Sequence, residues 1–153
     1  MNIAAGVLLI IASIFNFVGG CTYVVGGGAV AGISEVGSKG HEIALASDPN
    51  YADYADPDME STFNAGKATG AGLMFWGFAL LVIACIMIGG AVCSFCKKAK
   101  GFVMATAILA ILAEVVGVSL TVFGPSNFIG LLAGIFTFIG LRSYNSPFSE
   151  PAA

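Results

Sequence analysis

Residues 69–92 read TGAGLMFWGFALLVIACIMIGGAV and carry no charged side chain. The hydrocarbon core of a bilayer is about 30 Å thick, so a helix needs roughly 20 mostly apolar residues to cross it. This stretch therefore predicts a transmembrane helix. On either side of it the chain holds three further apolar stretches, which cover about residues 3–30, 102–123 and 127–143.

The composition of the whole chain agrees with a membrane location. Apolar residues make up 58% of the 153 residues, charged residues make up 10%, and the mean hydropathy is +0.93. A soluble domain usually has about a quarter of its residues charged, so this chain has too few polar side chains to cover a globular surface. Its net charge is −3 and it has no basic tract, so we expect no nucleic-acid binding.

The four stretches predict an all-α fold, an integral membrane bundle of four transmembrane helices with one large acidic extracytoplasmic loop. The segment Gly-Pro-Ser-Asn at 124–127 breaks a helix and can cap the next one, so it predicts a tight antiparallel hairpin. Ser143 and Tyr144 are expected to carry the short fourth span to the interface. In one membrane domain, we expect spans at about 3–30, 68–93, 102–123 and 127–143, an outer loop at 31–67, an inner basic loop at 93–101 and a tail at 144–153.

The distribution of charges predicts the orientation of these spans. Residues 93–101 hold three lysines and no acid, and Arg142 lies at the end of the fourth span. Short loops rich in Lys and Arg stay on the cytoplasmic side. Residues 31–67 instead hold seven acids against two lysines. We therefore expect both termini in the cytoplasm, the acidic loop outside and the chain in the cell (inner) membrane.

The outer loop is expected to be mostly coil, with a helix beginning near Pro57. Asp56 precedes this proline, and acids follow it in what would be the first turn, which is a typical helix start. The loop has too few apolar residues to fold alone, so we expect a partner or the other outer turn to hold it. It is either a solvated acidic segment or a docking patch formed by Tyr51, Asp53, Tyr54, Asp56 and Asp58. The spacing of its acids does not match an EF-hand calcium loop.

Glu114 lies in the middle of the third span. An ionisable group at that depth costs on the order of 3 kcal/mol on insertion scales, so it normally faces protein or water. Its helical neighbours at steps of three, four and seven are small or weakly polar, which indicates a face turned towards another helix. These neighbours are Ala107, Ala110, Gly117 and Thr121.

Two roles for Glu114 follow from this placement. Desolvation raises the pKa of a buried carboxyl group, so a neutral Glu114 can donate one structural hydrogen bond to a neighbouring helix. Asn16 and Ser13 of the first span are the candidate partners. The alternative is an intramembrane proton or ion site that uses Glu114 and Asn16.

Residues 108–118 read ILAILAEVVGV and resemble the carboxylate-bearing helix of rotary-ATPase proteolipids. The resemblance implies an ion carried on Glu114, and it covers about ten residues of one helix. That family repeats its hairpin pattern and keeps its loops short, whereas this chain has a long loop and no evident repeat. The order of elements also resembles claudin-like tetraspan proteins, which carry a Trp and a Cys pair in the first outer loop; residues 31–67 have neither. The sequence alone assigns no family.

Small residues predict where the helices pack. Patterns of two small residues four positions apart let helix backbones approach closely in lipid. The phenylalanine-rich faces of the spans can contact lipid, a bound lipid or pigment, or another subunit. The small-residue patterns pair Gly66 with Gly70, Ala113 with Gly117, and Gly130 with Gly134.

The sequence leaves three classes of function to distinguish. We expect a non-catalytic accessory or structural subunit of a larger membrane complex, whose partners are other membrane subunits and the bilayer. The alternative is a small transporter or ion-conducting oligomer that uses Glu114. Enzymatic activity is not expected, because His41, the loop carboxylates and the Cys93-Ser94-Phe95-Cys96 motif lie on opposite sides of the predicted membrane. No cofactor, metal or small-molecule substrate is expected, since one CxxC motif supplies only half of a zinc site.

Overall fold

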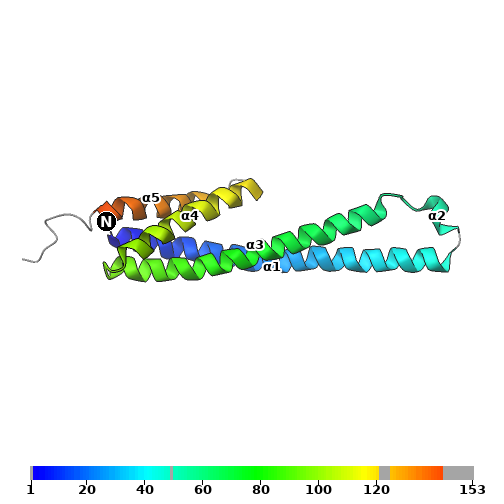
Figure 1. The fold of residues 1–153 in the computed structure, drawn as a ribbon, viewed down its shortest axis with the longest axis horizontal. Coiled ribbons are helices and arrows are strands. Elements are labelled where there is room, and N and C mark those ends of the chain that lie inside the picture. Colours follow the sequence, from blue (N-terminus) through cyan, green and yellow to red (C-terminus); the bar gives the residue numbers. More distant parts are fainter. Residues whose placement is uncertain (1, 49, 121–124, 143–153) are drawn as a thin grey trace, which may run out of the picture. The chain divides into compact units, whose positions relative to one another are not determined.

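The computed structural model describes residues 2–48, 50–120 and 125–142, and every regular element in this part of the chain is an α-helix (Figure 1). The prediction of an all-α fold is therefore confirmed for the described residues. Positions 121–124 and 143–153 lie outside them, and so do the predictions made for Thr121, Gly124, Ser143, Tyr144 and the tail. The helices are α1 (Asn2–Ser47), α2 (Tyr51–Tyr54), α3 (Met59–Phe95), α4 (Lys100–Leu120) and α5 (Pro125–Arg142).

Helices α1, α3 and α4 are each long and apolar enough to cross a membrane. Helix α5 is apolar but shorter, with 18 residues. The chain divides into two compact units. The four-helix unit combines residues 1–19 with residues 80–153, and the hairpin unit holds residues 20–79.

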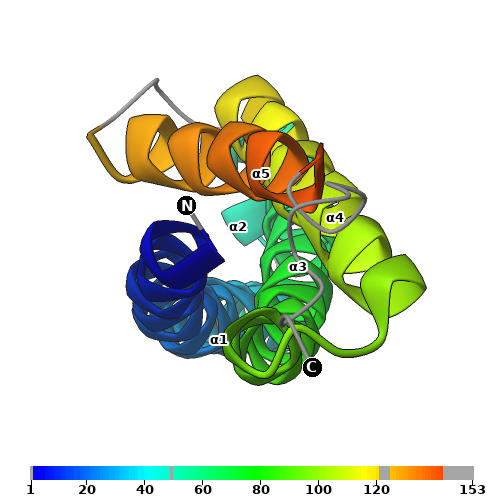
Figure 2. The same cartoon turned by 90° about the vertical axis from the view of Figure 1, so that its left-hand side faces the viewer.

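In the four-helix unit, small side chains form the core between the helices. The buried positions of α1 recur every three or four residues, which places them on one helical face. Helices α4 and α5 lie side by side (Figure 2). Because alanine adds only a methyl group, helix axes can approach closely at such a core. The core cluster consists of Leu9, Ala12, Met87, Ala91, Ala110 and Ala133.

In the hairpin unit, α1 and α3 run antiparallel and touch through their backbones at glycines (Figure 1). A Cβ atom added to Gly70 would lie 2.6 Å from the carbonyl oxygen of Gly27 and 2.6 Å from the amide nitrogen of Ala31. Seven residues further along α3, a Cβ atom on Gly77 would lie 2.7 Å from the carbonyl oxygen of Gly20. These distances are too short for real Cβ contacts, so the close approach requires glycine at both positions.

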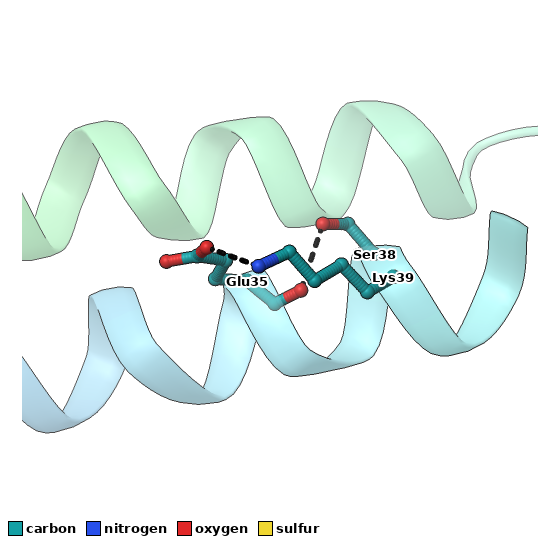
Figure 3. Close-up of polar contacts among 3 residues, drawn as sticks. All are labelled: Glu35, Ser38 and Lys39. Carbon is teal, nitrogen blue, oxygen red and sulfur yellow. Dashed lines mark hydrogen bonds and ion pairs between the residues drawn. The ribbon is translucent and has the colours of Figure 1, made fainter.

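The prediction of a coil over residues 31–67 is wrong, because α1 continues to Ser47 and α3 already begins at Met59. The ammonium group of Lys39 lies 2.7 Å from the Glu35 carboxylate, one turn away (Figure 3). The Ser38 hydroxyl also donates to the Glu35 carbonyl oxygen at 3.0 Å. Charge pairs at this spacing stabilise an exposed helix by a few tenths of a kcal/mol, and no proline interrupts the chain before residue 49.

The start of α3 lies two residues from the predicted one. The amide of Asp58 donates to the Asp56 carboxylate at 2.9 Å, and the amide of Met59 donates to the Asp56 carbonyl oxygen at 3.1 Å. Asp56 thus satisfies amides that lack partners at a helix start. The sequence signal at Asp56 and Pro57 identified this capping turn correctly.

The end of α3 forms a Schellman turn with lysine in the position that normally holds glycine. The amide of Lys98 donates to the Cys93 carbonyl oxygen at 3.0 Å, and the amide of Lys97 donates to the Ser94 carbonyl oxygen at 3.3 Å. Lys97 has a φ of 52°. This left-handed conformation costs an L residue roughly 1–2 kcal/mol, whereas glycine adopts it readily.

We therefore expect Lys97→Gly to stabilise the protein by about 1 kcal/mol. The measurement is the free energy of unfolding of the purified protein in a titration of mixed detergent micelles with SDS. Lys98→Gly is the matched control, since it removes the same charge from a neighbour without the left-handed φ. An equal effect of both substitutions would show that loss of charge, and not the backbone conformation, controls stability here.

Candidate functional site

The main candidate site is the carboxyl group of Glu114 on α4, within the four-helix unit. Glu114 is 7% exposed, and the neighbouring positions Ala107, Ala110 and Ala113 are buried with it. This face packs on α5, where Gly130 and Ala133 are also buried. The packing of α4 on α5 thus shields the Glu114 carboxyl group from its surroundings, as is usual for an ionisable group in an apolar helix.

Gly130 lies directly beneath the Glu114 side chain. A Cβ atom built on Gly130 would overlap the Glu114 carboxyl group, including its Oε1 atom. Any larger residue at position 130 must therefore displace the carboxyl group. One turn further along α5, a Cβ atom on Gly134 would lie 2.5 Å from Cγ1 of Ile111 and 3.2 Å from the Ala107 carbonyl oxygen. Both glycines thus allow α5 to lie against the face of α4 that carries Glu114.

The two candidate partners of Glu114 are buried on α1, and each makes a hydrogen bond to another group. Asn16 is buried on α1, and its amide group donates to the sulfur of Met87 on α3 at 3.4 Å. Ser13 is also buried, and its hydroxyl donates to the Ile10 carbonyl oxygen in its own helix at 2.7 Å. Asn16 thus links α1 to α3 within the four-helix unit, and a joint proton site of Asn16 and Glu114 stays a prediction.

The predicted small-residue pairs lie at different helix contacts. Gly66 faces Ser34, and Gly70 faces Gly27, both between α1 and α3 of the hairpin unit. Ala113 is buried and Gly117 half-buried on α4, whereas Gly130 and Gly134 lie on α5. The contacts of Gly20, Gly27 and Gly77 were not predicted from the sequence. The signal for them was that Gly20 and Gly27, like Gly70 and Gly77, are seven residues apart.

The predicted docking residues lie at the tip of the hairpin unit. Tyr51, Asp53 and Tyr54 belong to the short helix α2, and Asp56 and Asp58 belong to the turn before α3. The Tyr54 hydroxyl donates to the Asp48 carboxylate at 2.5 Å. Several of these side chains thus hold the tip itself together.

The same contacts shift the pKa of Asp48. The hydrogen bond from the Tyr54 hydroxyl is the larger cause that lowers the pKa of the Asp48 carboxyl group, and the bond from the Asn50 backbone amide is the smaller one. The bond between Tyr54 and Asp48 also raises the pKa of Tyr54. Since the folded-state pKa of Asp48 is below its ordinary value, this stabilisation is present above the ordinary pKa. It is lost as the pH falls through the lowered pKa.

No group of three or more His, Cys, Asp or Glu side chains is arranged to hold a metal ion in the described part of the chain. Cys21, Cys85 and Cys96 are exposed thiols. Comparisons of the sequence with protein-family models and with curated proteins, and of the structure with solved structures, find no match. The chemistry of the site itself is therefore the basis of any functional assignment.

Proposed function

We propose that the chain is a non-catalytic accessory or structural subunit of a larger integral-membrane complex. In this proposal four helices span the membrane, both termini and the loop at 96–99 are cytoplasmic, and the tip of the hairpin unit is outside. The four-span arrangement rests on the apolar character of α5 in addition to α1, α3 and α4. The orientation rests on the lysines that follow α3 and on the acids of the hairpin unit.

An exposed apolar stripe on α1 carries this proposal. Ile33, Val36 and Ile43 are 74%, 73% and 65% exposed, and their spacing of three and seven residues places them on one face of the helix. Glu35 and Lys39 lie between them. Because charged residues at this density do not enter the hydrocarbon core, the stripe begins at the level of Lys67 and runs outward from the membrane. A contiguous row of exposed aliphatic side chains outside lipid favours an interaction surface. A partner helix that covers the stripe accounts for it.

The packing around Glu114 supports a structural role over a transport role. Its carboxyl group lies against Gly130, between two helices whose contact is made of alanine and glycine. A carboxyl group in such a contact can hold α4 and α5 in register, because each helix offers few other polar groups at that depth. Proton or ion conduction remains the alternative function, and substitutions at Glu114 distinguish the two.

The test uses cysteine labelling in intact cells. In a background in which the four native cysteines are replaced, Tyr54→Cys should react with a membrane-impermeant biotin maleimide. Capture from mild detergent should then recover a stoichiometric membrane-protein partner. Lys98→Cys is the control for orientation and should react only after permeabilisation. The Tyr54→Cys chain that also carries Ile33→Ser and Val36→Ser should no longer recover the partner. The Tyr54→Cys chain that carries Ala46→Ser instead should still recover it.

Two outcomes would contradict the proposal. Labelling of Lys98→Cys in intact cells would reverse the orientation. Docking through the stripe would be excluded if the chain were recovered without a partner. It would also be excluded if the partner were recovered equally with the natural stripe and with the altered one.

A further inference from the structure

The hairpin unit contains a half-open cavity that the proposed function does not use. The cavity has a volume of about 360 Å³ and lies between α1 and α3. This volume falls within the range of small-ligand sites, which begins at about 300 Å³. The lining residues whose side chains can bind a ligand by charge or through an aromatic ring are His41 and Glu42 from α1, and Glu60, Phe63 and Lys67 from α3.

Aromatic contacts fix one wall of the cavity. The ring of Phe63 packs against Gly37, where an added Cβ atom would lie 2.5 Å from the ring. The His41 ring lies 6.4 Å from that of Phe63 and 5.5 Å from that of Tyr51, measured between centroids. His41 Nδ1 and the Tyr51 hydroxyl also share a hydrogen bond of 3.3 Å. Because His41 is held from two sides, this wall is preorganised.

The charges on the walls do not neutralise one another. In the described ranges the side-chain ion pair at bonding distance is that between Lys39 and Glu35; Lys67 interacts with Glu35, and Glu42 with Lys39, only at longer range. Lys67 and Glu60 are separated by two helical turns, or about 10 Å along α3. The cavity therefore has the Lys67 ammonium group at one end and the Glu60 carboxylate at the other. The Glu42 carboxylate lies beside the aromatic wall.

The position of Lys67 in the sequence indicates which end of the cavity is nearer the bilayer. Lys67 is the last charged residue before the uncharged stretch 68–96 of the chain. The cationic end of the cavity therefore lies where α3 enters the membrane, and Glu60 lies two turns further out. A zwitterionic phospholipid headgroup has the same order, since its phosphate is next to the glycerol and its ammonium group is further from the membrane.

We propose that this cavity binds a phosphate-linked ammonium zwitterion, supplied as the headgroup of a phosphatidylethanolamine or phosphatidylcholine lipid. The Lys67 ammonium group binds the phosphate, as a point charge suited to phosphate. Glu42 and Glu60 bind the ammonium end, and the Phe63 ring supplies a cation–π contact. The inference rests on the placement of α3 in a bilayer and is independent of any partner subunit.

The test measures lipid retention by the purified full chain. The protein is placed in nanodiscs that contain equal amounts of phosphatidylcholine, phosphatidylethanolamine and phosphatidylglycerol, transferred to detergent, and analysed for bound lipid by mass spectrometry. We expect about one zwitterionic lipid per chain, in preference to phosphatidylglycerol. Lys67→Gln and Glu60→Gln should each reduce retention by about tenfold, the loss expected when one charged contact worth about 1.4 kcal/mol is removed.

Lys39→Gln is the matched control, because it removes a lysine of the same unit that does not line the cavity, and it should retain lipid like the natural chain. Unchanged circular dichroism and Trp76 emission would show that the variants remain folded. Equal retention by Lys67→Gln and Lys39→Gln, or a preference for phosphatidylglycerol, would overturn the proposal. Binding of soluble glycerophosphocholine without retention of any lipid would overturn the lipid source.

Discussion

Gly70→Leu should lower the free energy of unfolding by about 3 kcal/mol, the upper part of the range for overpacked interiors. The added side chain meets backbone atoms of Gly27 and Ala31 at distances near 2.6 Å. Backbone atoms in the middle of a helix cannot move aside as the end of a side chain can, so α1 and α3 must separate in the hairpin unit. Trp76 is the only tryptophan of the chain, and it lies in the same segment of α3, so its emission in an SDS titration reports this separation.

Gly72→Leu is the matched control for this prediction. Position 72 is on the same helix, and an added Cβ atom there meets nothing within 4 Å. Since glycine inside a helix is less favourable than other residues by roughly 0.5–1 kcal/mol, Gly72→Leu should be neutral or slightly stabilising. Equal destabilisation by the two substitutions would show that the glycine contact does not hold the hairpin unit together.

The long apolar stretches were predictable because membrane insertion depends on composition summed over about 20 residues, which a sequence displays directly. The helical hairpin between residues 31 and 67 was not predicted, although the residues of two interactions that stabilise it can be seen in the sequence. Glu35 and Lys39 stand one helical turn apart, and Gly37 leaves room for the ring of Phe63. The first interaction is local, but the second depends on the register between two helices, which composition does not reveal.

The same distinction applies to the candidate site. The small residues at 107 and 110 predicted that Glu114 faces other helices, and the structure places it at 7% exposure. Its contact with Gly130 could not be derived, because it depends on how α4 and α5 are aligned. Asn16 is buried, and its amide group donates to the sulfur of Met87, a contact that the sequence did not predict. A helical face can thus be predicted from spacing, whereas the identity of the opposite residue requires tertiary structure.

Gly130→Ala should destabilise the four-helix unit by about 1 kcal/mol, less than Gly70→Leu, because the new methyl group displaces the end of the Glu114 side chain and not backbone atoms. Glu114→Ala combined with Gly130→Ala should recover part of this loss, since the shortened side chain leaves room for the methyl group. The free energies of unfolding of the two single variants and the double variant form a cycle. We expect a coupling energy of about 0.5–1 kcal/mol, within the range for residues in contact. A coupling energy near zero would mean that the two side chains do not share this space in the membrane.

Conservative substitutions at Glu114 then separate structural from conducting roles. Glutamine keeps the size and hydrogen-bonding capacity of a neutral carboxyl group, so Glu114→Gln should leave stability and assembly nearly unchanged. Leucine keeps the volume but not the hydrogen bond, so Glu114→Leu should weaken assembly by about 1 kcal/mol. Proton flux into liposomes that contain each variant is the second readout. Because glutamine cannot exchange a proton as a carboxyl group does, normal assembly of Glu114→Gln with loss of a flux seen in the natural chain would establish proton conduction and displace the structural role.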